Sequence, residues 1–277
     1  MKLMCRVADV SRSGYYAARR RPQSRRALEN RCLTDKIEAI HREKHKDVYG
    51  SRRMHVELVS YGYRCDRHRV ERLMRLAGVR AAGRRLRLHR SADDVPQEEA
   101  VVPDRLRRNF TVVLPDRVWM ADITQMKTDE GVLYVAIALD LCSRMVVGWM
   151  AGATKDRWLT VAAIEMAFGW RQPPAELIHH SDRGGQYACA DYAAVLSKYG
   201  ALASMSRPGT PLDNAPMESF MKTLKVELVY RRRFETRREA IAELGEYLQM
   251  FYNCRRRHSA LGYLSPAEYE KQLREPA

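Results

Sequence analysis

Three acidic residues stand in settings where a carboxylate can take part in chemistry. Asp122 lies within an apolar stretch, Asp182 follows another such stretch and precedes a Gly184-Gly185 pair, and Glu218 lies near the start of a helical pattern. Between Asp182 and Glu218 there are 35 residues. Three carboxylates in such places can hold two divalent cations, and a pair of ions of this kind suits in-line displacement at a phosphodiester. These residues are therefore our candidate metal-binding site.

The residue types alone are a weak signal, because residues 111–277 contain 20 acidic side chains. The settings are more specific: one acid inside a strand, one before a tight turn, and one on a helix that follows an irregular loop. Asp140 also ends a predicted strand, but it lacks a glycine or polar loop that would open a ligand site around it. We therefore exclude Asp140 from the site, and a turn cap is an equally good role for its carboxylate.

The elements expected to position the acids form a mixed sheet. Residues 118–126 alternate well enough for a strand that contains Asp122, and residues 132–139 are apolar enough to be buried on both faces. Three strands in succession, followed by alternating helices and strands, predict an α/β fold with a mixed sheet flanked by helices. The remaining predicted elements are strands at 145–149, at 177–178 leading into Asp182 and at 202–205, and helices at 158–170 and 191–199.

The helix that carries Glu218 follows a stretch rich in proline and glycine at residues 206–213, which we expect to be an irregular and mobile loop. Asp213 or Asn214 is the expected N-cap, and Pro216 is tolerated in a first turn. The helix has one apolar face, which consists of Met217, Phe220, Met221, Leu224 and Leu228.

Two lysines share a neighbouring flank of this helix with Glu218. Lys222 and Lys225 follow the glutamate at positions i+4 and i+7. Lys222 can simply form an ion pair with Glu218. A functional interpretation is that both lysines contact the DNA backbone while the glutamate binds metal, and the two interpretations are compatible.

Positive charge is concentrated in the first third of the chain. Residues 1–92 carry 25 lysines and arginines against 9 acidic residues, although the whole chain has a net charge of +15. A basic first third before a balanced body is typical of a nucleic-acid-binding region on a globular domain. A charged surface that only promotes solubility is the alternative, which we disfavour because arginine dominates and binds phosphate well.

The basic region contains a candidate helix-turn-helix at residues 51–77. A helix is predicted from Ser24 to about Lys44, a second at 52–60 with Ser51 as its N-cap, and a third at 67–76. A small helical hairpin without DNA-binding function is the alternative, and the charge favours DNA binding. The first helix is expected to bury Leu28, Leu33, Ile37 and Ile40, and the third Val70, Leu73, Met74 and Ala77. Arginines on the outer face of the third helix are Arg69, Arg72 and Arg75.

The predicted organisation has three parts. Residues 1–83 form the basic helical region, residues 84–110 a linker, and residues 111–277 the catalytic core with a basic helical tail. Within that tail, the arginine clusters at 231–233 and 255–257 follow predicted helices, and we expect them to contact DNA rather than only solvent.

The cysteines and histidines indicate neither disulfides nor zinc. Six cysteines are scattered without a C-x-x-C pair, which favours a reducing compartment. His41 and His45 have the spacing of a helical metal pair, but no second ligand pair follows. We find no signal peptide and no apolar run of membrane length, so we expect a soluble cytoplasmic protein.

Several motifs together carry a resemblance that spans nearly the whole chain. They are Tyr49–Arg53, Arg69–Met74, Trp119–Thr124, Asp140–Arg144, His180–Tyr187, Asn214–Lys225, Tyr252-Asn253 and Arg257–Tyr263. The chain resembles the DDE transposases of bacterial insertion sequences, whose catalytic core is similar to that of retroviral integrases. It looks most like the second-reading-frame product of the insertion-sequence-three family.

This resemblance implies a ribonuclease-H-like core of five strands, with Asp122, Asp182 and Glu218 as metal ligands and Lys225 as the accompanying basic residue. It implies two Mg²⁺ ions, with Mn²⁺ able to substitute, that support cleavage at the ends of a DNA element and transfer of a 3′-hydroxyl strand to target DNA. The DNA contacts expected besides Lys222 and Lys225 are Arg52, Arg53, Arg69, Arg72 and Arg75. Departures from the family pattern at Met120, Ala121 and Met217 touch no expected ligand.

The resemblance also bears on partners. Double-stranded DNA is the expected partner, and we expect a homo-oligomer on DNA. The active enzyme of this family is usually a frameshift fusion with an upstream frame that supplies a further helix-turn-helix and a coiled coil. No heptad run is present here, so we expect either an upstream-frame protein or a fusion with it. The alternatives are a nuclease of the same fold without strand transfer, a DNA-binding regulator with an inert acidic site and, least favoured, an RNA-binding protein.

Overall fold

The computed structural model describes residues 2–81 and 102–275. The chain divides into two compact units, one within residues 1–81 and the other within residues 82–277. Each unit has its own hydrophobic core and is described by itself. Across the described ranges, we find no helix with both the length and the apolar character needed to cross a membrane.

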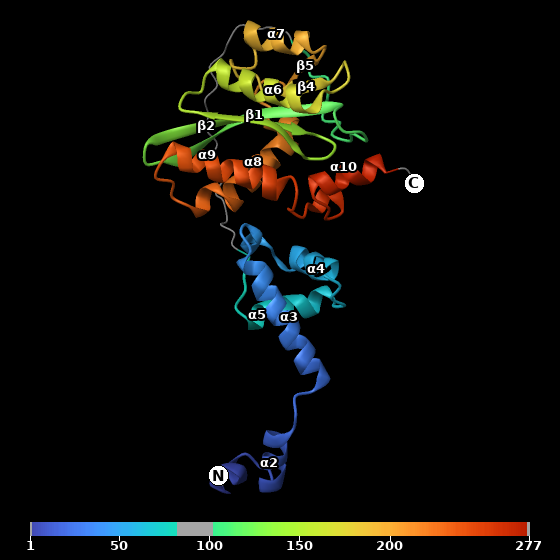
Figure 1. The fold of residues 1–277 in the computed structure, drawn as a ribbon, viewed down its shortest axis with the longest axis vertical. Helices are drawn as coiled ribbons and strands as arrows, with labels where there is room; N and C mark the ends of the chain where they lie inside the picture. Colours follow the sequence, from blue (N-terminus) through green and yellow to red (C-terminus); the bar gives the residue numbers. More distant parts are fainter. Residues whose placement is uncertain (1, 82–101, 276–277) are drawn as a thin grey trace. The chain divides into compact units, whose positions relative to one another are not determined.

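The first unit is helical (Figure 1). Its core is formed by Leu33, Ile37 and Ile40 of the third helix together with apolar residues of the two helices that follow it, among them Met54 and Leu58. Leu28 is 54% exposed, so the prediction that it shares the buried face is wrong. The helices are α1 (Lys2–Val7), α2 (Arg12–Arg20), α3 (Arg25–Arg42), α4 (Ser51–Ser60) and α5 (Arg67–Leu76).

Side-chain caps explain where two of these helices begin. Ser24 accepts a hydrogen bond from the Ala27 amide at 3.2 Å and starts α3, and Asp66 accepts one from the Arg69 amide at 2.9 Å and starts α5. The prediction that Ser51 caps α4 is wrong, because Ser51 is the first helical residue and Gly50 precedes it without a side-chain bond.

A buried ion pair fixes the connection between α3 and α4. The Lys46 ammonium lies 2.6 Å from Glu57 Oε1 and 2.7 Å from Glu43 Oε2, and Lys46 is only 6% exposed. Burial opposes the charge on Lys46, but its hydrogen bonds to Glu43 and Glu57 outweigh burial and raise the pKa of the lysine. Breaking such a pair leaves an uncompensated buried charge, which costs about 3–5 kcal/mol.

The second unit contains a five-stranded sheet with the order β3-β2-β1-β4-β5. Strands β1 to β3 are antiparallel neighbours, whereas β4 and β5 run parallel to β1. This is the mixed sheet flanked by helices that the sequence predicts. The strands are β1 (Val118–Thr128), β2 (Gly131–Asp140), β3 (Val146–Gly152), β4 (Ile178–Ser181) and β5 (Leu202–Met205).

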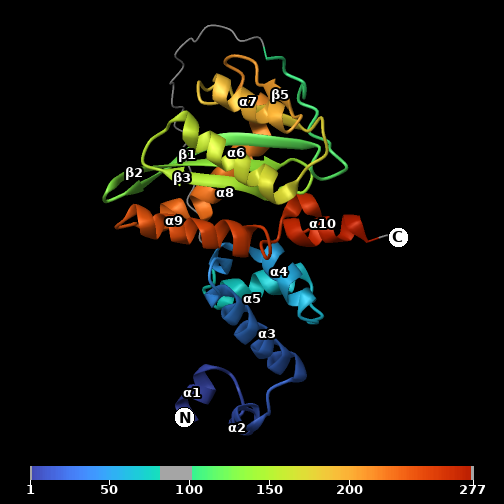
Figure 2. The same ribbon diagram turned by 45° about the horizontal axis from the view of Figure 1, so that its top comes forward.

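Helices cover both faces of the sheet. Helices α6 and α7 lie over one face, and α8, α9 and α10 lie over the other, as the two views agree (Figures 1 and 2). Their bounds are α6 (Arg157–Arg171), α7 (Ala190–Lys198), α8 (Ala215–Glu227), α9 (Arg237–Gly245), which continues as a π-helical segment (Glu246–Tyr252), and α10 (Pro266–Arg274).

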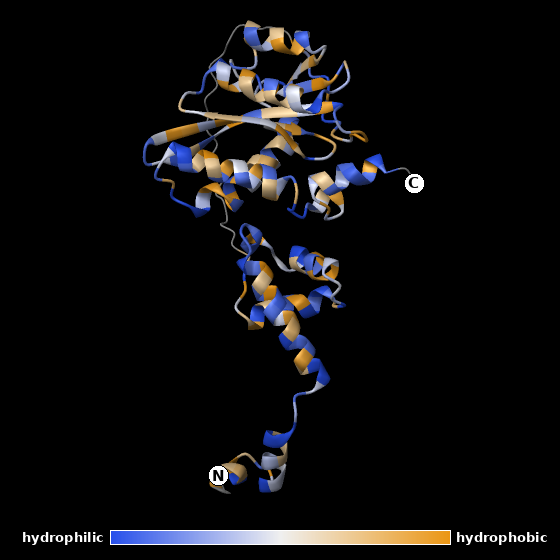
Figure 3. Cartoon of the chain, in the orientation of Figure 1, coloured by the Kyte–Doolittle hydropathy of each residue, from blue (hydrophilic) through white to orange (hydrophobic). Residues whose placement is uncertain are grey.

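A hydrophobic core lies between the sheet and α6. Trp119 of β1 contacts Phe168 of α6 with ring centroids 5.2 Å apart. At Gly148 of β3 a Cβ atom would lie 2.3 Å from the Ala163 carbonyl oxygen, so only glycine permits this approach of helix to strand. The central strands are coloured largely as hydrophobic in Figure 3, whereas the helices of the first unit mix both classes.

Neighbouring segments cover part of each edge strand of the sheet, β5 and β3. Next to β5, the Arg105 amide donates to Ser204 Oγ at 2.9 Å and Met205 donates to the Pro103 carbonyl at 3.3 Å. At β3, the Asn253 side chain bonds both the amide and the carbonyl of Val146, each at 2.9 Å. Of the predicted linker 84–110, residues 84–101 lie outside the described residues, and part of the remainder makes these contacts with β5.

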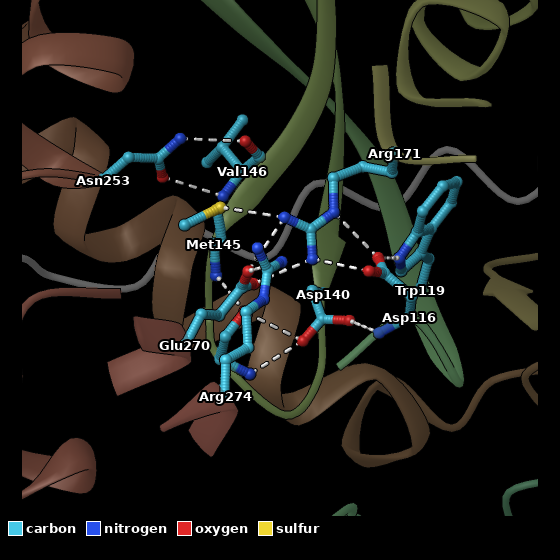
Figure 4. Close-up of polar contacts among 10 residues, drawn as sticks. Asp116, Trp119, Asp140, Met145, Val146, Arg171, Asn253, Glu270 and Arg274 are labelled. Atoms are coloured by element: carbon cyan, nitrogen blue, oxygen red, sulfur yellow. Dashed lines mark hydrogen bonds and ion pairs between the residues drawn. The ribbon is translucent and has the colours of Figure 1, made fainter. Parts of the chain in front are cut away.

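A polar network joins α10 to the sheet (Figure 4). The Arg171 guanidinium lies 2.6 Å from Asp116 Oδ2 and 2.9 Å from Glu270 Oε2, and Trp119 Nε1 donates to Asp116 Oδ1 at 3.1 Å. Asp140, which is fully buried, accepts hydrogen bonds from the Asp116 amide and from the Ser143 amide, both at 2.7 Å. The Asp140 carboxylate therefore caps the turn after β2.

Candidate active site

Two of the predicted acids meet at the centre of the sheet. Ala121 of β1 pairs with Ser181 of β4 in parallel register, so Asp122 and Asp182 each follow one member of this pair. Burial and then the negative charge of Asp182 raise the pKa of Asp122 to about 7. The Asp182 carboxylate is thus close enough to act on Asp122, and the two carboxylates form a concentrated negative site.

Three groups partly stabilise the ionised form of Asp122. The Ile123 amide donates a hydrogen bond to Asp122 Oδ1 at 2.7 Å. The positive charges of Lys225 and Lys155 also act on Asp122, and all three lower its pKa, although burial and Asp182 outweigh them. Lys155, in the segment between β3 and α6, escaped the sequence analysis because neither periodicity nor a motif marks it.

The turn after Asp182 leaves little room for a side chain at Gly184. The Gly184 amide donates to Asp182 Oδ1 at 3.1 Å. A Cβ atom at Gly184 would lie 3.1 Å from that same oxygen and 3.2 Å from Gln186 Oε1. Any larger side chain at position 184 would therefore press on both groups, and the glycine holds the exposed Asp182 carboxylate in place.

Glu218 lies in the first turn of α8, as expected, and α8 contacts β1. Partial burial raises the pKa of Glu218. Within residues 2–81 and 102–275, however, no three acidic, histidine or cysteine side chains lie close enough to share a metal ion. The structure thus brings together Asp122 and Asp182, and Glu218 does not join them in a three-residue cluster.

The apolar face predicted for this helix is confirmed, since its residues are all buried: Met217, Phe220, Met221, Leu224 and Leu228. Lys225 is partly buried and Lys222 is exposed. In the part of the chain that the structure describes, no ion pair joins Lys222 to Glu218, so this simple interpretation of Lys222 is not supported.

The start of α8 is held in a different way from the one predicted. Asn214 occupies the N-cap position without a side-chain hydrogen bond, and residues 211–214 form a 3₁₀ turn within the loop. The buried Asp213 carboxylate instead binds Arg207 at 2.8 Å and Arg108 at 2.6 Å. The hydrogen bonds from Arg207, opposed by burial and reinforced by Arg108, lower the pKa of Asp213.

Buried polar residues surround the acids. His180 contacts Ser204 Oγ at 2.8 Å and Ser206 Oγ at 3.1 Å, which links the ends of β4 and β5. Tyr187 is buried, and its hydroxyl lacks a hydrogen-bond partner among the described residues. Burial raises the pKa of Tyr187 most, and the charges of Tyr192, Asp122 and Asp182 add to this effect. Tyr187 therefore lies close to the acidic pair.

The arginines predicted to contact DNA differ in their surroundings. Arg52, Arg72 and Arg75 are exposed, whereas the Arg53 guanidinium is partly buried and lies 5.6 Å from the Tyr49 ring centroid. Arg69 donates to Asn30 at 2.9 Å and lies 3.3 Å from Glu29, so it joins α5 to α3.

The expectation that the C-terminal arginine clusters contact DNA needs correction for Arg256. Arg256 is 4% exposed and makes two hydrogen bonds to Glu227, at 2.7 and 2.8 Å, so its guanidinium is buried in the core. Others form ion pairs at the surface: Arg232 with Glu243, Arg233 with Asp129, and Arg257 with Glu268.

The histidine pair considered for zinc does not form a site. His41 lies in the last turn of α3, but His45 lies beyond the end of that helix, with a positive φ of 68°. The two side chains are therefore not one turn apart on a single helix. Both belong to the described residues, among which no metal-ligating cluster occurs.

Comparisons with protein families and solved structures show which proteins this chain resembles. A family described as an integrase core domain matches residues 113–211, a second of the same description matches residues 199–266, and an HTH-like domain matches residues 27–87. A chain of a simian T-cell lymphotropic virus intasome, solved in complex with the PP2A regulatory subunit B56 gamma, superposes with a TM-score of 0.51. It is 14% identical and covers 88% of this chain and 76% of its own length, which supports the fold alone.

Two curated relatives match almost end to end. The transposase InsF for insertion sequence IS3A of Escherichia coli (strain K12) is 37% identical over 277 residues, covering 98% of this chain and 94% of that protein. The IS600 uncharacterized 31 kDa protein of Shigella sonnei is 39% identical over 274 residues, covering 99% of this chain and all of that protein.

The fold and the family matches define the class: an integrase-type catalytic core, a polynucleotidyl transferase scaffold, combined with an HTH-like domain. The chain belongs to the transposases of the IS3 family.

Proposed function

We propose that this transposase cleaves DNA at the ends of its insertion sequence and joins the resulting 3′-hydroxyl to target DNA, with Asp122, Asp182 and Glu218 as the catalytic metal ligands. The observation that carries the proposal is that Asp122 and Asp182 directly follow the paired residues Ala121 of β1 and Ser181 of β4, and that Asp182 is close enough to raise the pKa of Asp122. A carboxylate pair of this kind is a donor set for a divalent cation.

The residues fit magnesium. Mg²⁺ prefers oxygen ligands and is commonly held by one or two carboxylates together with substrate phosphates. Asp122 would supply one carboxylate from β1, Asp182 a second from the position directly after β4, and Glu218 a third from the first turn of α8. We propose two Mg²⁺ ions, with Mn²⁺ able to substitute.

When bound, the metal supplies an activated water or 3′-hydroxyl and stabilises the leaving oxygen. The protein groups position the reaction. The Gly184 amide orients the Asp182 carboxylate and the Ile123 amide orients that of Asp122. Lys225, whose charge acts on Asp122, is suited to hold the phosphate beside the reacting bond.

DNA would be delivered by the basic part of the chain. We assign residues 1–83 to a DNA-binding region, residues 84–110 to a linker, and residues 111–277 to the catalytic core. The HTH-like match supports DNA recognition by the first region. Arg52, Arg72 and Arg75 are exposed and available for phosphate contacts. Lys222 would add a DNA contact from the catalytic core. To contact DNA, Arg53 and Arg69 would have to give up part of their present contacts with other side chains.

The test uses end-labelled linear duplexes that carry the terminal sequences of the element, incubated with the purified chain and Mg²⁺, with and without the upstream-frame product. Asp122→Asn, Asp182→Asn and Glu218→Gln should each abolish cleavage and joining. Asp129→Asn, an exposed acid paired with Arg233, is the matched control and should retain both activities.

The outcomes separate the alternatives. Cleavage without joining would indicate a nuclease of the same fold. DNA binding without cleavage in the presence of Mg²⁺, both with and without the upstream-frame product, would indicate a regulator. Retention of near-parental cleavage by any one of the three acid variants would refute the assignment of that residue.

A further inference from the structure

A shallow cavity that is widely open to solvent, with a volume of about 420 Å³, lies between the start of α6 and the loop that follows Asp182. No function described above uses it. Its lining includes a large aromatic side chain, an amide and backbone from a glycine-rich turn. The lining residues are Asp156, Arg157, Trp158, Gly185, Gln186 and Cys189.

This cavity adjoins the acidic pair. A Cβ atom placed on Gly184 would lie 3.2 Å from Gln186 Oε1 and 3.1 Å from Asp182 Oδ1, so both oxygens lie beside Gly184. Gln186 Nε2 also donates to the Lys155 carbonyl at 3.2 Å, and the Lys155 charge acts on Asp122. One wall of the cavity therefore lies between the acids and the start of α6.

The aromatic wall is open to solvent. Trp158, in the first turn of α6, is 57% exposed, although an indole of this size gains from burial. The Arg157 guanidinium carbon lies 5.1 Å from the indole centroid. An exposed indole beside a cation offers the kind of surface on which nucleobases stack, whatever their sequence, because every base has a π-face.

The charges around the cavity suit a nucleic-acid strand. Asp156 caps α6 by accepting a hydrogen bond from the Leu159 amide at 3.1 Å, and Asp191 pairs with Arg157 at 3.0 Å. Both nearby acids are thus already bonded. Lys155 is exposed beside them.

We propose that this cavity binds one unpaired nucleobase of the DNA strand next to the scissile phosphodiester, with the base stacked on Trp158 and its polar edge facing the Gln186 amide. This inference rests on the proposed function for the position of the scissile bond. Withdrawing a base from the duplex would leave the adjacent phosphate beside Asp122 and Asp182.

The full chain is tested, in the absence of divalent cations, for binding to two DNA probes of equal length. One probe is a blunt duplex, and the other, called the forked probe, is a duplex with three unpaired nucleotides at its 3′ end. The parent should bind the forked probe more tightly. Trp158→Ala should weaken binding to the forked probe by about 5- to 150-fold, the range measured for loss of one base–aromatic stack. Trp158→Phe should restore most of the preference.

The control is Trp170→Ala, at the other end of α6, because Trp170 is 58% exposed and lines no part of this cavity. Stacking also quenches indole fluorescence. The forked probe should quench the parent and the Trp170→Ala variant, and Trp158→Phe should lose this quenching while still binding.

Equal preference for the forked probe in the parent and Trp158→Ala would overturn the proposal, and so would an equal loss in Trp170→Ala. Because the readout needs no metal and no cleavage, it is independent of the acid variants. If the acid variants lose cleavage while Trp158→Ala binds the forked probe as the parent does, the proposed function stands. Only the proposed base site is then refuted.

Discussion

At the scale of single residues, Asp122 is the most perturbed of the three candidate acids. Its carboxyl group lies in a partly buried position beside Asp182, and its pKa is raised to about 7 by burial and by that neighbour. The pKa of Asp122 is higher in the folded state than in the unfolded state. As the pH rises from the unfolded value to the folded value, the unfolded state releases this proton while the folded state keeps it, and the folded state loses stability. The pair therefore costs stability at neutral pH when no cation is bound.

We expect Asp122→Asn to be more stable than the parent above pH 7 without divalent cations, and equal to it below about pH 4. The reason is that the parent has to bear the unfavourable folded-state charge of Asp122 only above the pKa that this residue has in the unfolded state, and asparagine carries no such charge. The difference should grow through this window to a few kcal/mol, since one pKa unit corresponds to about 1.4 kcal/mol. Thermal midpoints of both proteins from pH 4 to 8 measure it.

Saturating Mg²⁺ should raise the thermal midpoint of the parent and should act much less on Asp122→Asn, because the ion binds the folded carboxylate pair. A stability difference that does not change with pH, or an Asp122→Asn variant less stable than the parent at pH 8, would contradict this prediction.

Lys225 and Lys222 form a matched pair on one helix. Only Lys225 is partly buried, and its charge acts on Asp122. We expect Lys225→Ala to lower the rate of cleavage and joining by at least tenfold at limiting DNA, because its phosphate contact is lost. Lys222→Ala should lower DNA affinity only slightly. Single-turnover rates with end-labelled duplexes measure both, and equal rates for Lys225→Ala and the parent would make the lysine a simple surface charge.

At the scale of elements, α8 determines where Glu218 lies. Its first turn follows the loop in which Asp213 binds Arg207 and Arg108, and neither arginine is fully buried. The loop is thus fastened by a buried carboxylate, while the buried apolar face holds the rest of the helix on the sheet. Glu218 can approach the other acids only if both attachments hold the helix start in place.

We expect Asp213→Ala to destabilise the protein by about 2 kcal/mol, below the 3–5 kcal/mol of a fully buried pair because both arginines keep contact with water. Mg²⁺-dependent cleavage should fall further than the loss of folded protein explains. Urea unfolding and cleavage at a temperature where the variant is folded measure the two effects.

The control for this clamp is Asp129→Ala, which removes an exposed ion pair with Arg233 and should cost less than about 1 kcal/mol. Full cleavage activity of folded Asp213→Ala would show that the clamp does not position α8.

At the scale of the whole molecule, the chain combines a basic helical unit with a catalytic core. Residues 1–92 hold 25 of the 49 lysines and arginines, and exposed Arg52, Arg72 and Arg75 belong to the helical unit. In the core, several arginines have acidic partners, so fewer are free for DNA than the sequence suggests. Duplex binding should therefore depend mainly on the first unit.

We expect a fragment of residues 1–92 to bind duplex DNA, with an affinity that falls steeply as salt rises, because phosphate contacts release counterions. Replacing Arg72 and Arg75 together by alanine should reduce the slope of log affinity against log salt by up to about 2. Fluorescence anisotropy across a salt series measures the slope. No binding at low salt, or binding independent of salt, would contradict the prediction.

The sequence by itself determined the local features. Alternation predicted β1, a continuous apolar run predicted β2, helical periodicity predicted the buried face of α8, and β5 was predicted with its observed bounds at 202–205. These features follow from short-range periodicity and from the concentration of charge, which a single chain segment encodes. The settings of Asp122, Asp182 and Glu218 singled them out among many acidic residues, the family motifs agreed with this choice, and it stays a prediction.

The tertiary structure alone decided which charged groups meet. Asp122 faces Asp182 because two strands distant in sequence pair in parallel register. Lys155 reaches the same site without any local signal. Arg256 and Arg69, which belong to basic stretches, are held by acidic or polar partners far along the chain. The physical reason is that the pairing of charged groups depends on long-range packing, which no local pattern specifies.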